Sequence, residues 1–230
     1  MDYIILLPVF NNHLLFKNYT YKFIKRYNLQ DKCIMLIQNE DDEENYAEFI
    51  DIKKERCPVG KDRAINYMSR ILPLDTNIVC MDDDLTGLID LCGNLIDDVN
   101  ELFIEMFETM HKDNITLGGF YPVPNTFFMK KQKSITTHLT FIVGSCFLYI
   151  NKRIPIEASG KQDYIFSIEN FNYARKLLRY NHIAIKYQYK AGMEQENDLQ
   201  KFIDKYSDYI SYIKYNKKNK TSIILKKIET

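Results

Sequence analysis

The sequence has no tryptophan, and it contains only eight glycines and six prolines among 230 residues. This scarcity of glycine and proline excludes a collagen-like or low-complexity chain. No apolar run approaches the ~20 residues that a membrane-spanning helix needs. The residues from Met1 to Phe10 lack the basic lead-in and cleavage site of a signal peptide. We therefore expect a soluble cytoplasmic or other intracellular protein without a membrane partner.

Charge and cysteine content exclude further classes. The 31 basic and 31 acidic residues cancel, which excludes a protein held on nucleic acid by its bulk charge but leaves room for a local basic patch. The five cysteines are odd in number, and no two have C-x-x-C spacing, so neither a disulfide framework nor a zinc ribbon is expected. The length and the 46% hydrophobic content suit one domain with its own core.

Short apolar runs alternate with longer amphipathic runs in the first half of the chain. Strands are expected at residues 3–9, 33–37 and 77–81 and near 50–54, and helices at 14–27, after the acidic stretch 38–44, at 61–71 and at about 94–111. This rhythm predicts an α/β fold with a mostly parallel central sheet flanked by helices. Such sheets bind ligands at the carboxyl ends of their strands, so the loops after strands are the expected place for chemistry.

The second half carries more strand signals. Strands are expected at 115–121, 134–150, 183–187 and 221–225, helices at 162–180 and 197–213, and a polar loop from Gly192. The rings of Tyr121, Phe127 and Phe128 are expected in the core, with the lining of an acceptor pocket as the alternative. Because no linker or internal repeat is visible, we expect a single domain over residues 1–230. Residues 1–92 would form its nucleotide-binding half and residues 93–230 its acceptor half.

Three adjacent carboxylates, Asp82, Asp83 and Asp84, directly follow the expected strand 77–81. Like charges repel, and their proximity is unfavourable unless a cation compensates it. Mg²⁺ and Mn²⁺ take oxygen ligands and bridge to phosphates. In an extended segment Asp82 and Asp84 point the same way and Asp83 the other way. The pattern favours one metal held by Asp82, Asp84 and a diphosphate; a solvated acidic turn or a helix cap is the alternative.

Three weaker features accompany the aspartates. Lys61 and Arg63 follow Gly60 at a helix start, where amides and positive charge suit a phosphate or form a basic cap. The acidic loop with Asp41 follows the second strand, where it could contact a base or ribose or form a solvated turn. Asp163 opens the helix at 162–180; it is a general-base candidate if it faces the diphosphate and otherwise a cap.

The order of these motifs resembles the GT-A glycosyltransferases with their DxD motif. More specifically, the chain is similar to the TET-associated glycosyltransferase group of phages and large DNA viruses, which is related to base J glucosyltransferases. The resemblance runs from about Tyr3 to about Gly192 and rests on IILLPVFNN, GKDRAIN, VCMDDDLTGL, LGGFYPVPNTFFMKK, LTFIVGSCFLYINKR, KQDYIFS and YKAGM. The chain departs from the family's I-P-S-Y-x-R-P start, and it has Gln162 where the family has the glutamate of an E-D pair, so only Asp163 carries over.

The resemblance implies a metal-dependent transferase that moves a sugar from a nucleotide-sugar donor, expected to be a UDP-sugar, to an acceptor hydroxyl. The implied acceptor is a hydroxymethylated pyrimidine in DNA, and the implied cofactor is Mn²⁺ or Mg²⁺. The implied site residues are Asp82 and Asp84 for the metal, Asp83 for the sugar or ribose, Lys61 and Arg63 for the diphosphate, Pro8, Val9 and Asn11 for the nucleoside, Asp41 for the base, and Asp163 for activating the acceptor.

Other readings stay open at this point. The same enzyme could act on a glycan or a protein, or the aspartates could hold two metals in a nuclease or nucleotidyltransferase. A non-catalytic nucleotide- or sugar-binding module is a further alternative. The lysine-rich C-terminus could contact DNA phosphates or be a solvated tail; its lysines are Lys214, Lys217, Lys218, Lys220, Lys226 and Lys227.

Overall fold

The computed structural model describes residues 1–157, 161–188, 196–215 and 221–228. In these residues nine strands form one sheet in the order β3-β2-β1-β4-β8-β6-β9-β5, with β7 paired to β9, and β10 pairs with β11 in a separate hairpin. The strands are β1 (Ile4–Pro8), β2 (Cys33–Ile37), β3 (Lys53–Arg56), β4 (Asn77–Met81), β5 (Leu85–Ile89), β6 (Leu117–Tyr121), β7 (Ile135–Thr136), β8 (Cys146–Ile150), β9 (Leu178–Tyr187), β10 (Ile210–Tyr215) and β11 (Thr221–Leu225). The helices are α1 (His13–Asn18), α2 (Thr20–Arg26), α3 (Glu40–Asn45), α4 (Lys61–Ile71), α5 (Val99–Asp113), α6 (Thr126–Met129), α7 (Gln162–Ala174) and α8 (Glu196–Tyr206), with short 3₁₀ turns at Gln30–Lys32 and Ser207–Tyr209.

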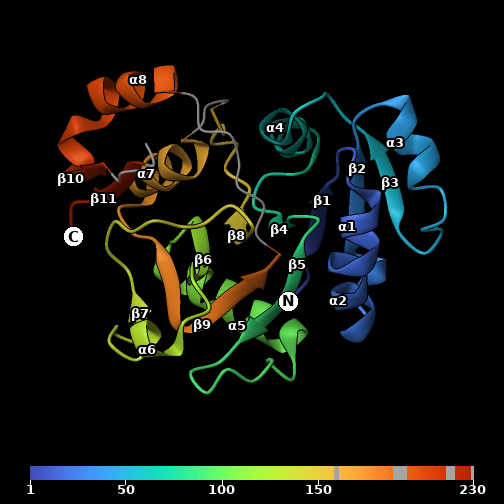
Figure 1. Cartoon of the computed structure of the whole chain (residues 1–230), viewed down its shortest axis with the longest axis horizontal. Coiled ribbons are helices and arrows are strands. Elements are labelled where there is room, and N and C mark those ends of the chain that lie inside the picture. The colour runs from blue at the N-terminus through green and yellow to red at the C-terminus, as the bar shows by residue number, and fades with distance from the viewer. Residues whose placement is uncertain (158–160, 189–195, 216–220, 229–230) are drawn as a thin grey trace.

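The predicted α/β class is confirmed. Strands β1 to β4 pair in parallel, β8 runs against both β4 and β6, and β6 pairs in parallel with β9. Since β5 and β7 run against β9, six of the nine described sheet strands point the same way. Helices cover both faces of this mostly parallel sheet. In Figure 1, α1, α2 and α3 lie beside β1–β3, and α7, α8 and the β10–β11 hairpin lie at the opposite end.

The alternation of side chains along the buried strands separates two apolar layers. In β1, Ile5 and Leu7 pack on the layer that includes the α5 rings Phe103 and Phe107. Leu6 packs on the other layer, with residues of α4, α7 and α8. Because successive side chains of a strand point to opposite faces, a continuous apolar run fits a strand covered on both sides. The site described below lies at the edge of the α4–α7 layer.

Helix boundaries are the main corrections in the first half. The predicted helix 14–27 is two helices, because Tyr19 leaves the helical region at φ −124° and ψ −79°. The helix predicted at 94–111 begins at Val99, where Asp98 caps it by accepting a hydrogen bond from Glu101 N. Strand β5 was not predicted, since its pattern LTGLI follows the aspartates with no intervening turn signal.

In the second half, the strand signals of residues 134–150 correspond to two short strands and a long loop. The predicted helix 162–180 ends at Ala174, and the one predicted at 197–213 ends at Tyr206, because β9 and β10 take the residues that follow. Phe127 and Phe128 are exposed rather than in the core. The predicted loop at Gly192 lies outside the described residues, as do Lys217, Lys218 and Lys220.

None of the helices in the described ranges has the length and apolar character to cross a membrane.

Candidate active site

Four chain segments meet at one edge of the sheet. Strand β4 ends at Met81, and Asp82–Asp84 form the short connection from β4 to β5. Because β8 runs against β4, it begins at the same edge, just after Gly144 and Ser145. Helices α4 and α7, which pack on the same face of the sheet, begin at Lys61 and Gln162. The sheet topology thus brings together the aspartates, Lys61 and Asp163, which are far apart in sequence.

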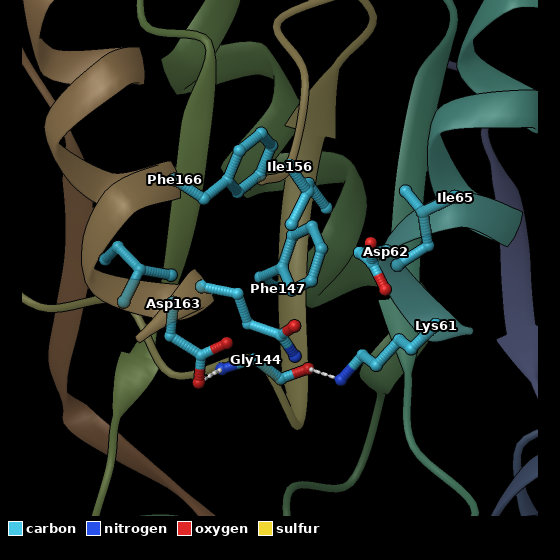
Figure 2. A pocket seen from close by; sticks show the side chains of 10 residues that line it. Lys61, Asp62, Ile65, Gly144, Phe147, Ile156, Asp163 and Phe166 are labelled. Atoms are coloured by element: carbon cyan, nitrogen blue, oxygen red, sulfur yellow. Dashed lines mark hydrogen bonds between the residues drawn. The ribbon is translucent and has the colours of Figure 1, made fainter. Parts of the chain in front are cut away.

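A chain of hydrogen bonds links the carboxylate of Asp82, a predicted metal ligand, to the carboxylate of Asp163. Lys61 Nζ donates to Asp82 Oδ1 at 2.5 Å and to the Gly144 carbonyl oxygen at 2.8 Å. The Gly144 amide donates to Asp163 Oδ2 at 2.8 Å. In Figure 2, Lys61 and Asp163 approach the Gly144 peptide from opposite sides, one from α4 and the other from α7. The backbone of Gly144, through its carbonyl oxygen on one side and its amide on the other, therefore connects the two acidic groups.

The close approach of the Asp163 carboxylate requires a glycine at position 144. A Cβ added at this position would lie 2.9 Å from Asp163 Cγ and Oδ2, and closer still to Oδ1. Distances under 3 Å are far inside van der Waals contact, so any larger residue would displace the carboxylate. The glycine therefore lets the backbone amide reach the carboxylate directly.

Asp163 combines burial with a cationic neighbour. Burial raises the pKa of Asp163, the Lys61 ammonium and the Gly144 amide lower it, and the net direction is upward. Only Oδ2 receives a hydrogen bond within the described part of the chain, so Oδ1 remains available to accept one. A carboxylate with a raised pKa and an open oxygen is suited to take a proton from a hydroxyl.

The backbone of the three aspartates is held by its neighbours. Asp82 N donates to the Ser145 carbonyl, and Thr20 Oγ1 donates to the Asp82 carbonyl at 2.6 Å. Gln188 N donates to the Asp84 carbonyl at 3.0 Å. Helix α2 and the end of β9 thus fix the turn on which the carboxylates stand.

The pKa of Asp83 reflects the crowding of the three carboxylates. Burial, followed by the charges of Asp82 and Asp84, raises the pKa of Asp83 to about 6, although the Asn12 side chain donates a hydrogen bond to it. Burial is the largest cause of this shift, and repulsion from the two neighbouring carboxylates adds to it. A cation held by Asp82 and Asp84 would offset that repulsion.

These residues fit a divalent cation that a bound diphosphate also holds. Across the described ranges, no group of three or more His, Cys, Asp or Glu side chains could hold a metal by itself. Asp82 and Asp84 offer two hard oxygen donors, and Mg²⁺ or Mn²⁺ commonly completes its ligands with substrate phosphates and water. The donor set agrees with the metal expected from the sequence, provided that phosphate oxygens complete it.

The first strand leads into a loop that contacts a buried carboxylate. Pro8 and Val9 are buried at the end of β1, and Asn11 is exposed with a left-handed φ of 52°. Asn11 N donates to Asp42 Oδ1 at 2.8 Å, and Asp42 is fully buried. Asp42 Oδ2 has no hydrogen-bond partner in the described chain. Asp41, the residue predicted to contact a base, is exposed instead.

Gln38 joins the loops that carry these residues. Its Nε2 donates to the Val9 carbonyl at 2.9 Å, and its Oε1 accepts from Gly60 N at 2.6 Å. The ends of β1 and β2 and the start of α4 are thereby tied together. Arg63, predicted to meet a diphosphate, is exposed on the first turn of α4, whereas Lys61 is directed to Asp82 and Gly144.

A crevice between α4 and α7 opens beside these groups and encloses about 320 Å³, part of it open to solvent. Lys61, Gly144 and Asp163 border it, and Ile65, Phe147 and Phe166 form apolar walls (Figure 2). Apolar walls lower the local dielectric, which strengthens the interactions of the charged groups beside them.

Sequence reasoning did not identify Asp42, Gln38 or Gly144. The signal for Asp42 was its place three residues after Asn39, whose side chain caps α3 by accepting from Asp42 N at 2.7 Å. Gly144 stood in a motif quoted for the family resemblance, but no pattern indicated its contact with Asp163.

Comparisons with known proteins place the chain among glycosyltransferase folds. No protein-family model matches the sequence, and no curated protein matches it. The mannosyltransferase PcManGT from Pyrobaculum calidifontis, solved with GDP-Man and Mn²⁺, superposes with a TM-score of 0.60 at 11% identity, covering 82% of this chain and 57% of its own. GalNAc-T7, solved with UDP, GalNAc and Mn²⁺, gives 0.59 at 14% identity, covering 90% and 50%. Residues 1–349 of S. aureus TarS give 0.53 at 10% identity, covering 80% and 60%.

These similarities confirm the predicted GT-A-like fold. At 10–14% identity they establish the fold alone. The chain spans between half and six-tenths of the length of the three solved chains.

Proposed function

We propose that this chain is a metal-dependent glycosyltransferase that moves a sugar from a nucleotide-sugar donor to an acceptor hydroxyl. The observation that carries the proposal is the link from Asp82 through Lys61 and the Gly144 backbone to Asp163. Sugar transfer needs two separate electrostatic functions: charge stabilisation on the departing diphosphate, and proton removal from the acceptor. Asp82, as a metal ligand, has the chemistry for the first function, and Asp163, as a base, has the chemistry for the second.

Asp82 and Asp84 would hold Mn²⁺ or Mg²⁺, which when bound supplies positive charge to the departing diphosphate. Lys61 neutralises part of the charge on Asp82 and keeps that carboxylate oriented. Burial lowers the pKa of Lys61, but Asp82, Cys80 and Asp163 outweigh this and raise it, so the side chain stays protonated. Asp83 would face the sugar or ribose. Arg63 would reach the diphosphate only from the solvent side of α4.

Asp163 would take the proton of the acceptor hydroxyl as the new glycosidic bond forms. Its Oδ2 is held by the Gly144 amide, so Oδ1 is the oxygen that faces the acceptor. The apolar walls of the crevice would reduce the access of water to this side and so limit hydrolysis of the donor. Residues 1–92 would supply the donor side of the site and residues 93–230 the acceptor side.

The nucleoside would lie against Pro8, Val9 and Asn11 at the end of β1. Asp42 is better placed than Asp41 to shape this subsite, because Asp42 fixes Asn11 and has one buried oxygen without a partner. We propose a UDP-sugar as donor. PcManGT was solved with GDP-Man and GalNAc-T7 with UDP, which makes these two nucleotides the first to test.

We propose a hydroxymethylated pyrimidine in DNA as the acceptor, with a glycan or protein hydroxyl as the second candidate. The support for DNA is the sequence resemblance and the distribution of positive charge described below. A nuclease or nucleotidyltransferase with two metals agrees less well, because the described residues offer no cluster of three metal-ligating side chains.

Measuring donor hydrolysis and thermal stabilisation with UDP- and GDP-sugars tests this proposal. A donor that binds the folded chain raises its melting temperature by mass action. We expect stabilisation and hydrolysis that both require Mn²⁺ or Mg²⁺ and are lost with EDTA. Hydrolysis of plain DNA without any donor would instead indicate a nuclease, and indifference to EDTA would exclude the metal.

A further inference from the structure

The charges of this chain are divided unequally along its length. Residues 1–113 carry 22 Asp and Glu against 12 Lys and Arg, whereas residues 114–230 carry 9 against 19. No Asp or Glu occurs between Asp113 and Glu157, or between Glu169 and Glu194. A net charge of zero therefore conceals an acidic first half and a basic second half.

The two acid-free stretches lie together in the fold. Strand β7 pairs with β9 through Ile135 with Tyr180 and Thr136 with Arg179, and β6 pairs in parallel with β9. Figure 1 shows α6 and β7 beside the first part of β9. Strand β6 runs in the same direction as β4, so the segment after β6, residues 122–134, leaves the sheet at the edge where Asp82 follows β4. The region built from these two stretches thus begins at the active-site edge and contributes no carboxylate of its own. The acid beside it comes from another element: Glu105 of α5 accepts a hydrogen bond from the Tyr180 hydroxyl.

Two aromatic rings are exposed on this region. Phe127 is 60% exposed and Phe128 is 50% exposed, with ring centroids 5.4 Å apart. The Asn125 side chain accepts hydrogen bonds from the backbone N–H groups of both, which fixes the turn that presents the rings. Exposed neighbouring aromatic side chains are unfavourable in water and are typical of binding surfaces.

Positive charge surrounds these rings. Lys130, Lys131 and Lys133 are exposed, and in the described ranges none of them forms an ion pair with a carboxylate. Lys131 Nζ lies 3.9 Å from the centroid of the Phe127 ring. Arg179, on the strand that pairs with β7, donates to Asn181 Oδ1 and to the Phe141 carbonyl rather than to a carboxylate. The charge here is available to an anion.

We propose that this basic aromatic patch, formed by Phe127, Phe128, Lys130, Lys131 and Lys133, binds a single-stranded polynucleotide. Bases stack on exposed aromatic rings whatever their sequence, and lysines neutralise the phosphates between them. A polyanion without bases would use the lysines but leave the rings without a role. The patch gives the proposed transferase a means of holding its acceptor, and in that respect it rests on the proposed function.

The binding itself is tested without any sugar donor. Fluorescence anisotropy with a labelled 20-nucleotide thymidine strand measures Kd for the full chain at increasing salt. Two variants address the patch: Phe127→Ala with Phe128→Ala, and Lys130, Lys131 and Lys133 all changed to Gln. The matched controls are Tyr173→Ala, an aromatic that is 60% exposed elsewhere, and Lys22, Lys53 and Lys112 all changed to Gln, which removes the same charge from exposed positions in the first half.

We expect the ring variant to weaken binding about tenfold or more. The lysine variant should also weaken binding, and it should reduce the slope of log K against log salt by about 2, since each phosphate contact on a single strand contributes about 0.7. Both controls should bind within twofold of the wild type. Melting temperatures confirm that each variant is folded, which is expected because the changed side chains are exposed.

The proposal would be overturned if the strand does not bind at low salt, or if the control variants weaken binding as much as the patch variants do. It would also be overturned if inorganic polyphosphate of matched charge competes with the strand and the ring variant binds as tightly as the wild type. The last result would indicate a polyanion without bases. Donor hydrolysis measured on the same variants separates the two proposals. If the wild type hydrolyses the donor but does not bind the strand, only the proposed patch is wrong. If the wild type binds the strand but does not hydrolyse the donor, only the proposed transferase is wrong.

Discussion

Asp82 and Asp163 are 81 positions apart in the sequence, yet one lysine side chain and the backbone of one glycine connect them. Lys61 donates to Asp82 and to the Gly144 carbonyl, and the amide of the same glycine donates to Asp163. The separation of the two carboxylates is therefore constrained by the Lys61 side chain at the start of α4 and by the Gly144 backbone just before β8. A site with two separate acidic functions needs such a fixed separation.

Replacing Asp84 by Ala tests the metal assignment. The substitution removes a charged ligand from a turn without removing core packing, so the melting temperature should change little while transfer and donor hydrolysis fall at least a hundredfold. Steady-state assays with Mn²⁺ and with EDTA measure this. The exposed Asp31→Ala is the matched control and should behave like the wild type. Full turnover by Asp84→Ala would remove this residue from the metal site.

Replacing Asp163 by Asn tests the general base. The amide keeps the size of the side chain but cannot take a proton, so kcat should fall by about 10²–10⁴ while Kd for the donor stays the same. Because burial raises the pKa of Asp163, the acidic limb of the wild-type pH profile should lie above that of an ordinary aspartate. An equal loss of donor binding would instead assign Asp163 to the donor site.

Replacing Gly144 by Ala tests the contact between the glycine and Asp163. The added methyl group collides with the carboxylate, and we expect a loss of about 1–3 kcal/mol in unfolding free energy and a fall in kcat similar to that of Asp163→Asn. Combining Gly144→Ala with Asp163→Ala should recover much of the stability, because the colliding atoms are gone. Simple additivity in the unfolding free energies of this cycle would contradict the proposed collision.

The pKa of Asp83 makes stability depend on pH. Its folded-state value of about 6 lies above the ordinary value of 3.8, so the folded chain binds this proton more tightly than the unfolded chain. Without divalent cations, the unfolding free energy should therefore decrease as pH rises from about 4 to about 6. Since one pKa unit corresponds to about 1.4 kcal/mol, Asp83→Asn should remove up to about 3 kcal/mol of this decrease. Denaturant unfolding of both proteins at pH 4 and 7.5 measures the difference. If the unfolding free energy changes equally with pH in both proteins, Asp83 is not the group responsible. Mn²⁺ should stabilise the wild type more at pH 7.5 than at pH 4.

Asp42 and Asp41 form a matched pair of neighbouring acids. Asp42→Ala leaves the Asn11 amide without its acceptor, and we expect a loss of about 1–3 kcal/mol in stability and a raised KM for the donor. The exposed Asp41→Ala should change neither quantity. Thermal unfolding and donor titrations distinguish the two residues. A raised KM for Asp41→Ala alone would restore the interpretation drawn from the sequence.

The regular elements were predictable where local patterns were strong. The strands at Cys33–Ile37 and Asn77–Met81 and the helix at Lys61–Ile71 have the predicted bounds, because each is a continuous apolar or amphipathic run with clear flanking signals. The break at Tyr19 and the strand Leu85–Ile89 were not predictable in this way. They depend on tertiary partners: Thr20 Oγ1 bonds to the turn after β4, and β5 pairs with β9, about a hundred positions away.

The exposure of Phe127 and Phe128 shows the same limit. Two adjacent aromatic residues ordinarily indicate a core, and only the capped turn of α6 places them at the surface. For Asp41 and Asp42, composition could not show which of two neighbouring acids turns inward, since this depends on where Asn11 lies.

The sequence by itself determined the α/β class, most of the strands and the position of the aspartates after β4, because these follow from short-range apolar patterning and from charge repulsion. The tertiary structure alone decided that Lys61, Gly144 and Asp163 meet Asp82. That meeting depends on β8 running antiparallel between β4 and β6 and on α4 and α7 packing on one face of the sheet, both of which are long-range pairings that no local pattern encodes.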